Sequence, residues 1–232
     1  MEEIKVLNFR QLGGYPVKDG RKVRMDQFYR GGALIGLDPE TKHQLDELGL
    51  RHILDFRSQA EIDRREEEYV PRGAERTAIS ANRLSHEVRR DDLDFTSPNI
   101  ADDLENWLKE SYRLLPFENP AYQQAFSYIR KKETPFYFHC STGKDRTGVC
   151  AALILLFLGA EEKTVYEDYL KSYGNMIAAF KNPGRTLLVF PEWLQGALEE
   201  IKVRYPDLDS FFQEEFGIFP EERRALQDYY LE

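Results

Sequence analysis

A strand-like segment that leads through a polar loop into a long apolar segment constrains this fold more than any other feature of the sequence. Residues 134–139, TPFYFH, have the length and composition of a buried β-strand. Residues 149–160, VCAALILLFLGA, are too short to cross a bilayer and are typical of a buried helix. The loop CSTGKDRTG, residues 140–148, joins them. A strand followed directly by a buried helix is the unit of an α/β fold with a parallel sheet.

The remaining segments extend this α/β plan. The runs ILDF, residues 53–56, and QFYRGG, residues 27–32, predict two more strands. Asp38 or Thr41 caps a predicted helix that Gly49 ends. Further helices are expected at residues 58–70, 99–115, 120–132, 161–176, 191–205, 208–217 and 221–232.

Turns and polar segments separate these elements without dividing the chain. Asp19-Gly20 predicts a tight hairpin turn with positive φ at both positions. The charge run within residues 58–70 predicts an exposed helix face, and residues 83–96 predict a loop or mobile cover. No linker or repeat interrupts the sequence, so we expect a single domain over residues 1–232. Its fold class is α/β, with a central, mostly parallel sheet flanked by helices and with additional helices as a candidate lid.

Charge and cysteine content limit the partners of the chain. With 41 acidic and 32 basic residues, the net charge is −9, which disfavours nucleic acid as a partner. An anionic substrate must therefore be captured by a local cationic pocket. Only two cysteines are present, and no stretch resembles a signal peptide or membrane span, so we expect a cytoplasmic protein without stable membrane insertion. The sequence does not indicate an oligomeric state.

The loop after the strand carries the residues that cleavage of a phosphate ester by a thiol requires. The nucleophile must be a thiolate, a form that helix N-termini and nearby cations favour. Cys140 stands at the expected end of the strand, where an α/β sheet binds its ligands. Backbone N–H groups of such a loop form a nest for phosphate oxygens, and Arg146 can hold two oxygens with its planar fork. Gly143 and Gly148 allow close backbone approach.

The other loop residues fit the same chemistry. A hydroxyl of Thr147 or Ser141 can assist departure of the thiolate from a phosphocysteine, and His139 can support the loop from the strand. The candidate phosphate-binding residues are Ser141, Thr142, Gly143, Lys144, Thr147 and Gly148. The nucleotide-binding pattern G-x-x-x-x-G-K-[ST] is excluded, because Phe138 and Asp145 occupy positions that it reserves for glycine and a hydroxyl.

The sequence HCSTGKDRTG resembles the signature loop of the protein tyrosine phosphatase superfamily. Together with NFRQLGG at residues 8–14, LDFRS at 54–58 and DYLKSY at 168–173, it resembles the bacterial tyrosine and dual-specificity branch. That branch acts on phosphotyrosine, phosphoserine or phosphothreonine, and phosphoinositides. The resemblance covers residues 8–173, and the signature loop is its most specific part.

This resemblance implies roles for individual residues. Cys140 would be the nucleophile and Arg146 the phosphate clamp, while Lys144 is linked to tolerance of phosphoinositides. Outside the loop, three positions depart from the branch pattern: Gln11, Lys171 and Tyr173. Those departures leave the roles of the outer motifs open and do not touch the loop. The expected enzyme is a phosphatase that needs neither metal nor cofactor.

The general acid that protonates the leaving group has several candidates. Asp145 lies within the loop and is favoured by the resemblance, and Asp55 ends a predicted strand at the same sheet edge. Asp55 has the alternative role of pairing with Arg57 or Arg10 to brace the loop. A third set lies in the polar stretch: Asp91, Asp92 and Asp94.

Several interpretations stay open at this stage. Arg10, Arg30 and Arg57 are candidates for the pocket rim, with ordinary solvated arginines as the alternative. Cys150 is expected to fill the core, although a disulfide with Cys140 or a thiol-based reductase would use the same residue. The alternative to an active phosphatase is a weakly catalytic module that binds phosphoprotein or inositol phosphate.

Overall fold

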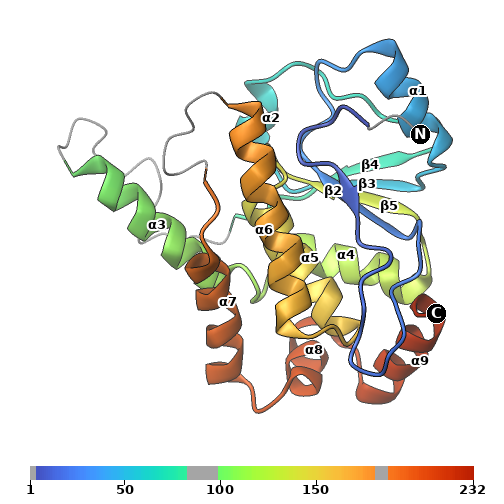
Figure 1. Ribbon diagram of the computed structural model, residues 1–232, viewed down its shortest axis with the longest axis vertical. Helices are drawn as coiled ribbons and strands as arrows, with labels where there is room; N and C mark the ends of the chain where they lie inside the picture. The colour runs from blue at the N-terminus through green and yellow to red at the C-terminus, as the bar shows by residue number, and fades with distance from the viewer. Residues whose placement is uncertain (1–3, 83–98, 181–187) are drawn as a thin grey trace.

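The computed structural model describes residues 4–82, 99–180 and 188–232. Its centre is a five-stranded sheet with helices on both faces (Figure 1). The strands are β1 (Arg10–Gln11), β2 (Phe28–Gly31), β3 (His52–Asp55), β4 (Glu75–Ala78) and β5 (Phe136–His139). Their order is β1-β2-β5-β3-β4, and every neighbouring pair is parallel except β1 with β2. The predicted fold class, a mostly parallel sheet flanked by helices, is confirmed.

The central strand β5 separates two apolar cores. Phe136 and Phe138 pack into the larger core, whereas Tyr137 packs into the smaller one, because successive side chains of a strand point to opposite faces. All four residues of β5 are buried, as expected for a parallel strand covered on both faces. This is why TPFYFH is continuously apolar rather than alternating.

Helices account for most of the remaining chain. They are α1 (Pro39–Glu47), α2 (Gln59–Asp63), α3 (Ile100–Leu114), α4 (Pro120–Lys131), α5 (Asp145–Phe157), α6 (Glu162–Ala179), α7 (Pro191–Arg204), α8 (Leu208–Phe216) and α9 (Pro220–Tyr230). Nearly all of α5 is buried, which matches its apolar sequence. Asp38 caps α1 through a hydrogen bond from the backbone N–H of Thr41, so the cap is Asp38 and not Thr41. Among the described helices, none combines the length and apolar character needed to cross a membrane.

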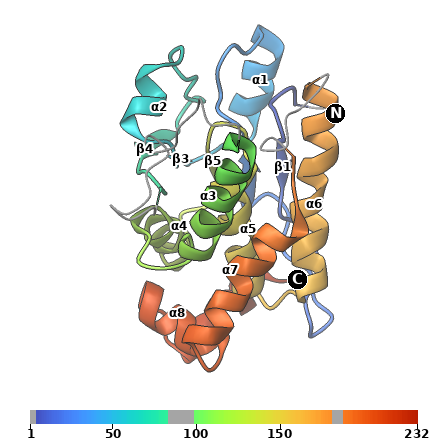
Figure 2. The same ribbon diagram turned by 90° about the vertical axis from the view of Figure 1, so that its left-hand side faces the viewer.

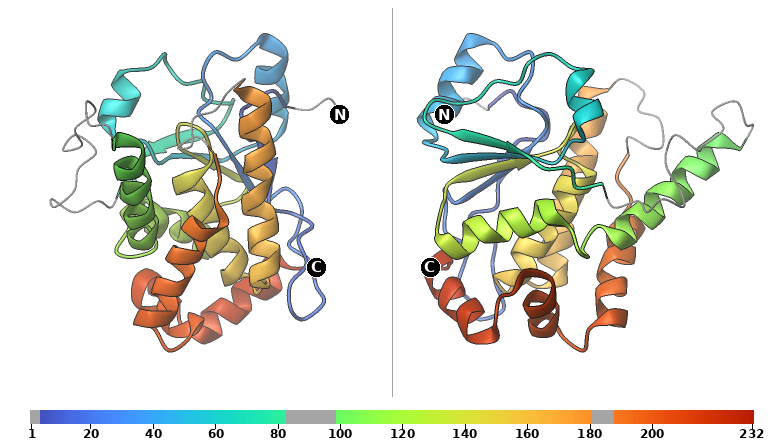
Figure 3. Two further views of the ribbon diagram at one scale, coloured as in Figure 1. Left: turned by 60° about the vertical axis from the view of Figure 1, so that its left-hand side comes forward. Right: turned by 180° about the vertical axis from the view of Figure 1, so that it is seen from behind.

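The helices α3 and α7 pack against each other and stand away from the sheet (Figures 2 and 3). They lie 77 positions or more apart in the sequence, yet they form one projecting pair beside α5 and α6. The final turn of α3 reaches the buried core through Tyr112. The candidate lid is therefore anchored at the C-terminal end of α3.

Some local predictions differ from the structure. Of the two hairpin positions only Gly20 has positive φ, because the loop is closed by a hydrogen bond from Val17 N–H to the carbonyl of Arg21 and is longer than a two-residue turn. Helix α2 ends at Asp63, well before residue 70, and the strand β4 was not predicted. The expected cover at residues 83–96 lies outside the described residues.

Candidate active site

The signature loop, residues 139–148, begins at the carboxyl end of β5 and ends in the first turn of α5. His139 is in register with Gly31 of β2 and with Asp55 of β3, so three parallel strands end at the same edge. Cys140 follows β5 directly and its side chain is buried. The loop therefore occupies the edge where an α/β sheet places its ligand site.

Close backbone contact holds the loop against the end of β2. Gly143 has φ of +69°, a conformation that favours glycine. A Cβ atom on Gly143 would overlap the backbone of Gly31 and would lie 2.7 Å from the nitrogen of Gly32. Only glycine fits this position without moving the strand or the loop.

Arg146 is held by a carboxylate of α2. Its Nη1 and Nη2 donate to the two carboxylate oxygens of Glu61, each at 2.7 Å, and Nη1 also donates to the carbonyl of Phe56 at 3.2 Å. Within the described chain, Nε of Arg146 donates to no acceptor. The end-on pair with Glu61 thus fixes the guanidinium and leaves its Nε edge to face a ligand.

The charges of this pair are strongly coupled. Burial alone would raise the pKa of Glu61, but the hydrogen bond and positive charge of Arg146 lower it to about 2. Burial alone would likewise lower the pKa of Arg146, whereas the negative charges of Cys140 and Glu61 raise it above its ordinary value. Both groups are therefore ionised at neutral pH.

Asp145 lies at the start of α5 beside the helix α3. The hydroxyl of Tyr112 donates to Asp145 Oδ1 at 2.7 Å, and the hydroxyls of Tyr112 and Tyr169 lie 2.8 Å apart. The Asp145 side chain is 25% exposed. It is the one candidate acid within the described residues that is both part of the loop and partly open to solvent.

Lys144 points away from solvent. Its ammonium donates to the carbonyl of Leu188 at 2.9 Å and lies 3.2 Å from Asp145 Oδ1. The ring centroid of Trp193 is 5.2 Å away, a cation–π distance. The Lys144 side chain is 1% exposed. It connects the loop to Leu188, just before α7, and to Trp193 in the first turn of α7.

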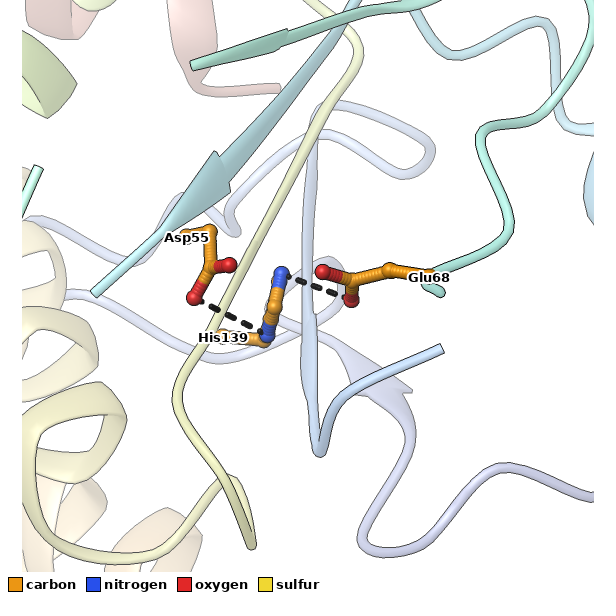
Figure 4. A group of neighbouring side chains, drawn as sticks. All are labelled: Asp55, Glu68 and His139. Atoms are coloured by element: carbon orange, nitrogen blue, oxygen red, sulfur yellow. Dashed lines mark ion pairs between the residues drawn. The ribbon is translucent and has the colours of Figure 1, made fainter. Parts of the chain in front are cut away.

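Behind the strand ends lies a buried group made of Asp55, His139 and Glu68 (Figure 4). The His139 ring stands between the two carboxylates, with Nδ1 3.8 Å from Asp55 Oδ1 and Nε2 3.1 Å from Glu68 Oε1. His139 Nδ1 is also 3.1 Å from the carbonyl of Cys140. The group therefore supports the backbone at Cys140.

Two arginines neutralise this buried group. Arg57 Nη2 pairs with Asp55 Oδ2 at 2.8 Å and also with Glu68, and Arg76 pairs with the same carboxylates. Asp55, Glu68 and His139 have the ligand atoms of a metal site within 4.8 Å of one another, but these guanidinium groups already occupy the carboxylates. Their positive charge opposes a metal ion, and the expected absence of a metal stays a prediction.

The environment of Asp55 bears on the general acid. Burial would raise the pKa of Asp55, but the hydrogen bond from Arg57, the charge of His139 and the hydrogen bond from Arg76 lower it well below its ordinary value. A carboxyl that stays ionised and fully buried is a poor proton donor. Asp55 instead pairs with Arg57, which is the alternative role of bracing the loop. Asp91, Asp92 and Asp94 lie outside the described residues.

A second buried network lies against the outer side of the loop. Arg30 Nη2 donates to the carbonyl of Gly143 at 2.8 Å, and Asn8 Nδ2 donates to the same oxygen at 2.9 Å. Asp168 pairs with Arg30 and with Arg10, whose Nε lies 2.7 Å from Asp168 Oδ1. Burial would raise the pKa of Asp168, but the two arginine charges lower it to about 2.

The three candidate rim arginines are thus placed differently from the expectation. Arg30 and Arg57 are buried in ion pairs, and Arg10 is 12% exposed in its pair with Asp168. Arg10 and Arg30 both meet Asp168, which lies far away in the sequence and which no local pattern reveals. Arg57 pairs with Asp55, the local alternative that the sequence offered. They brace the strand ends and the loop instead of lining an open rim.

The remaining loop residues contact neighbouring elements. Ser141 Oγ donates to Glu61 Oε1 at 3.1 Å, and Thr147 Oγ1 is buried and has no hydrogen-bond partner in the described chain. The carbonyl of Thr142 is 3.5 Å from Asn8 Nδ2. A Cβ atom on Gly148 would lie 3.1 Å from the Tyr169 ring, so α5 and α6 pack closely at this position.

Cys150 is an interior residue of α5. It is fully buried and free, as is Cys140. Burial raises the pKa of the Cys150 thiol, which keeps it protonated. A neutral, enclosed thiol fits the expected core-filling role, and its redox role stays untested.

Sequence reasoning missed several residues of this site. Glu61 and Glu68 belong to a charge run that was interpreted as an exposed face, but Glu61 pairs with the partly buried Arg146 and Glu68 with the buried Arg57. The others are Asn8, Tyr112 and Asp168. The capping pattern Ser58–Glu61 was the available signal, since it places Glu61 in the first turn of a helix directly after the β3 strand.

A thiol and a clamped arginine on one strand–loop–helix unit define a site built for a phosphate group. The family model of the tyrosine phosphatase family matches residues 3–232. The chain therefore belongs to the tyrosine phosphatase family, as its signature loop indicated.

Known proteins show how far this likeness extends. The chain is 30% identical over 171 residues to a putative tyrosine-protein phosphatase of Cupriavidus necator, covering 72% of this chain and 60% of that protein. It is 26% identical over 171 residues to the triple specificity protein phosphatase PtpB of Mycobacterium tuberculosis, covering 65% of this chain and 62% of that protein. The match thus spans under two thirds of either relative.

A solved structure with a similar arrangement is the core catalytic domain of the PP-IP phosphatase SIW14 from S. cerevisiae, in complex with citrate. The TM-score is 0.41 at 15% identity, over 89% of this chain and 90% of that chain. A likeness this low supports no conclusion about the present chain.

Proposed function

We propose that this protein is a phosphatase that hydrolyses phosphate monoesters through a phosphocysteine intermediate on Cys140. The observation that carries the proposal is the placement of Cys140 and Arg146 at the two ends of one loop, with Arg146 fixed by Glu61 and its Nε edge left for a ligand. Family membership supports the same activity.

The reaction divides into two displacements at phosphorus. The Cys140 thiolate forms an S–P bond as the P–O bond of the ester breaks, and Asp145 gives its proton to the leaving oxygen. Water then attacks phosphorus, the S–P bond breaks, and Asp145 takes the proton from water. The products are inorganic phosphate and the Cys140 thiolate, so the enzyme returns to its starting state.

Phosphotyrosine is the substrate class that we rank first, followed by phosphoserine or phosphothreonine and then by phosphoinositides. The relative from Mycobacterium tuberculosis carries the printed name of a triple specificity phosphatase, which supports a broad range. Lys144, the residue linked to lipid tolerance, is engaged by Leu188 and Trp193. An inositol phosphate would have to compete with those contacts, so we rank phosphoinositides last.

The setting of the enzyme is part of the proposal. A single phosphatase domain over residues 1–232 is supported by the extent of the family match. A cytoplasmic location is supported by the two unpaired cysteines, since a reducing compartment keeps thiols free. No cofactor and no nucleic-acid partner are expected.

The proposal is tested by phosphate release from a phosphotyrosine peptide, a phosphoserine peptide and several phosphoinositides, with a metal chelator present. We expect turnover by the wild type, highest on phosphotyrosine, and none by Cys140→Ser. Turnover that disappears with the chelator would contradict the mechanism. Binding of these ligands without turnover of any would favour the recognition module instead.

A further inference from the structure

A buried arginine stands directly behind the signature loop. Arg30 is 0% exposed, with Nη1 paired to Asp168 and Nη2 donating to the carbonyl of Gly143 at 2.8 Å. Asp168 is shared with Arg10, and the Tyr15 hydroxyl donates to it at 3.0 Å. Two arginines and one aspartate leave one net positive charge in this network. Such a charge behind a loop favours an anion in front of it.

The contacts of Arg30 also fix the direction of one peptide group. The carbonyl of Gly143 and the N–H of Lys144 belong to the same trans peptide, so they point in opposite directions. Arg30 and Asn8 both donate to that carbonyl from the outer side of the loop. The N–H of Lys144 is thereby turned toward the inner side, where the loop amides would surround a phosphate.

We propose that Arg30 is a positioning residue of the active site, which orients the Gly143–Lys144 peptide toward the phosphate and favours the Cys140 thiolate by its charge. The proposal rests on the proposed function for the identity of the bound anion. It assigns to Arg30 a role distinct from that of Arg146, which faces the ligand itself.

The ionisation of the network agrees with this geometry. Burial and the neighbouring Arg10 lower the pKa of Arg30 below its ordinary value, and the negative charge of Asp168 opposes this shift. Asp168, with its pKa of about 2, stays negative and keeps Arg30 charged at neutral pH.

An arginine is required because two partners lie at separate corners of the side chain. One nitrogen of the planar fork meets a carboxylate and the other meets a carbonyl. A lysine carries one compact ammonium and cannot hold both in the same geometry. Arg30→Lys therefore separates the charge of Arg30 from its orienting contacts.

The test compares Arg30→Gln, Arg30→Lys and Asn8→Gly with the wild type. Asn8 has φ of +60°, so glycine removes its amide without backbone strain. The matched control is Arg223→Gln, because Arg223 donates to the carbonyls of Leu156 and Phe157 at the opposite end of α5. All variants are checked for folding by circular dichroism and thermal unfolding.

The readouts are the pH profile of alkylation of Cys140 by iodoacetamide, followed by mass spectrometry of its peptide, and the Kd of inorganic phosphate. We expect Arg30→Gln to move the alkylation midpoint up by about one pH unit and to weaken phosphate binding by about tenfold. Arg30→Lys should have an alkylation midpoint close to that of the wild type but a weaker affinity for phosphate. Asn8→Gly should also weaken phosphate binding. Arg223→Gln should match the wild type in both readouts.

A folded Arg30→Gln variant with the wild-type alkylation profile and wild-type phosphate affinity would overturn the proposal. If Arg30→Gln does not fold, Asn8→Gly and Arg30→Lys decide it, and unchanged phosphate affinity in both would overturn it. Alkylation and phosphate binding need no turnover. A wild type that hydrolyses nothing would therefore defeat the proposed function while leaving this test intact.

Discussion

At the scale of single residues, the site depends on carboxylates that hold arginines in place. Glu61 holds Arg146, the proposed phosphate clamp, and Asp168 holds Arg30 behind the loop. In each pair the carboxylate is mostly enclosed, and the arginine lowers its pKa to about 2. The main effect of these pairs is to position the arginines, because the net stability gained from a buried ion pair is small once desolvation is included.

Glu61→Gln tests the role of the carboxylate on Arg146. The amide keeps the size of the side chain but loses the charge and one of the two acceptors, so Arg146 is held less firmly. We expect kcat/KM on p-nitrophenyl phosphate to fall by about tenfold. Glu67→Gln, which changes an exposed carboxylate of the same segment, is the matched control. Equal activity of both variants would show that Glu61 does not position the clamp.

Asp145→Asn tests the proton donor. An alkyl phosphate has a poor leaving group that needs protonation, whereas p-nitrophenolate leaves without help. We expect kcat to fall by about a hundredfold on the alkyl phosphate and only a few-fold on p-nitrophenyl phosphate. Equal losses on both substrates would argue against Asp145 as the acid.

At the scale of elements, two contacts join the loop to the projecting helices α3 and α7. Tyr112 of α3 donates to Asp145, and Lys144 donates to Leu188 just before α7. Consecutive residues at the start of α5 are thus attached to both members of the helix pair. A shift of that pair would change the surroundings of the candidate acid.

Tyr112→Phe tests the link between α3 and the acid. The ring packing of this fully buried residue is kept, and only its hydroxyl is lost. We expect kcat on an alkyl phosphate to change by several-fold and the free energy of unfolding to fall by about 1 kcal/mol. Tyr128→Phe is the control, because it removes a hydroxyl that bonds Thr77 away from the loop. Tyr128→Phe should lose a similar amount of unfolding free energy without a change in kcat. A Tyr112→Phe variant with wild-type kcat would show that the contact from α3 does not affect the acid.

Prediction from sequence succeeded where structure is local. The strand β5, the loop and the helix α5 are consecutive, and their apolar and glycine patterns determine their conformation without help from distant residues. It failed for β4, whose sequence ERTA is short and polar because it lies at the edge of the sheet. It also failed for the charge run after α2, since burial of Glu68 depends on two arginines that only the folded sheet brings to it.

The same limit applies to the arginines and their partners. Arg30 and Asp168 are 138 positions apart, and no local pattern links them. The sequence offered Cys140 and Arg146 as candidate site residues because one loop contains both. The residues that hold Arg146 and Gly143 could not be predicted, because they come from α2, β2 and the segment before β1. Arg30 is in turn held by Asp168 of α6.

At the scale of the whole molecule, the acidic chain concentrates buried positive charge at one edge of its sheet. The net charge is −9, yet Arg10, Arg30, Arg57 and Arg146 converge around the strand ends. The carboxylates that hold them must be ionised, so the stability of the fold depends on pH.

The lowered pKa of Asp168 determines how its contribution to the unfolding free energy changes with pH. Its ordinary pKa is 3.8 and its folded pKa is about 2, so its contribution is complete above 3.8 and is lost as the pH falls through 2. That contribution is about 2 kcal/mol. We expect the difference in unfolding free energy between the wild type and Asp168→Asn to shrink by this amount from pH 6 to pH 2.

Urea denaturation of both proteins across this range measures the difference. Asp63→Asn, a change at an exposed carboxylate, should keep the wild-type slope. Parallel curves for the wild type and Asp168→Asn would contradict the assigned ionisation of Asp168.

The most direct measurement of the central claim is rapid acid quenching of the wild type and Cys140→Ser during hydrolysis of p-nitrophenyl phosphate, followed by mass spectrometry of the peptides. The mechanism predicts phosphate on the peptide that contains Cys140 in the wild type. It predicts neither a phosphorylated peptide nor turnover in Cys140→Ser. Steady hydrolysis by Cys140→Ser, or turnover by the wild type with the phosphate on another residue, would contradict it.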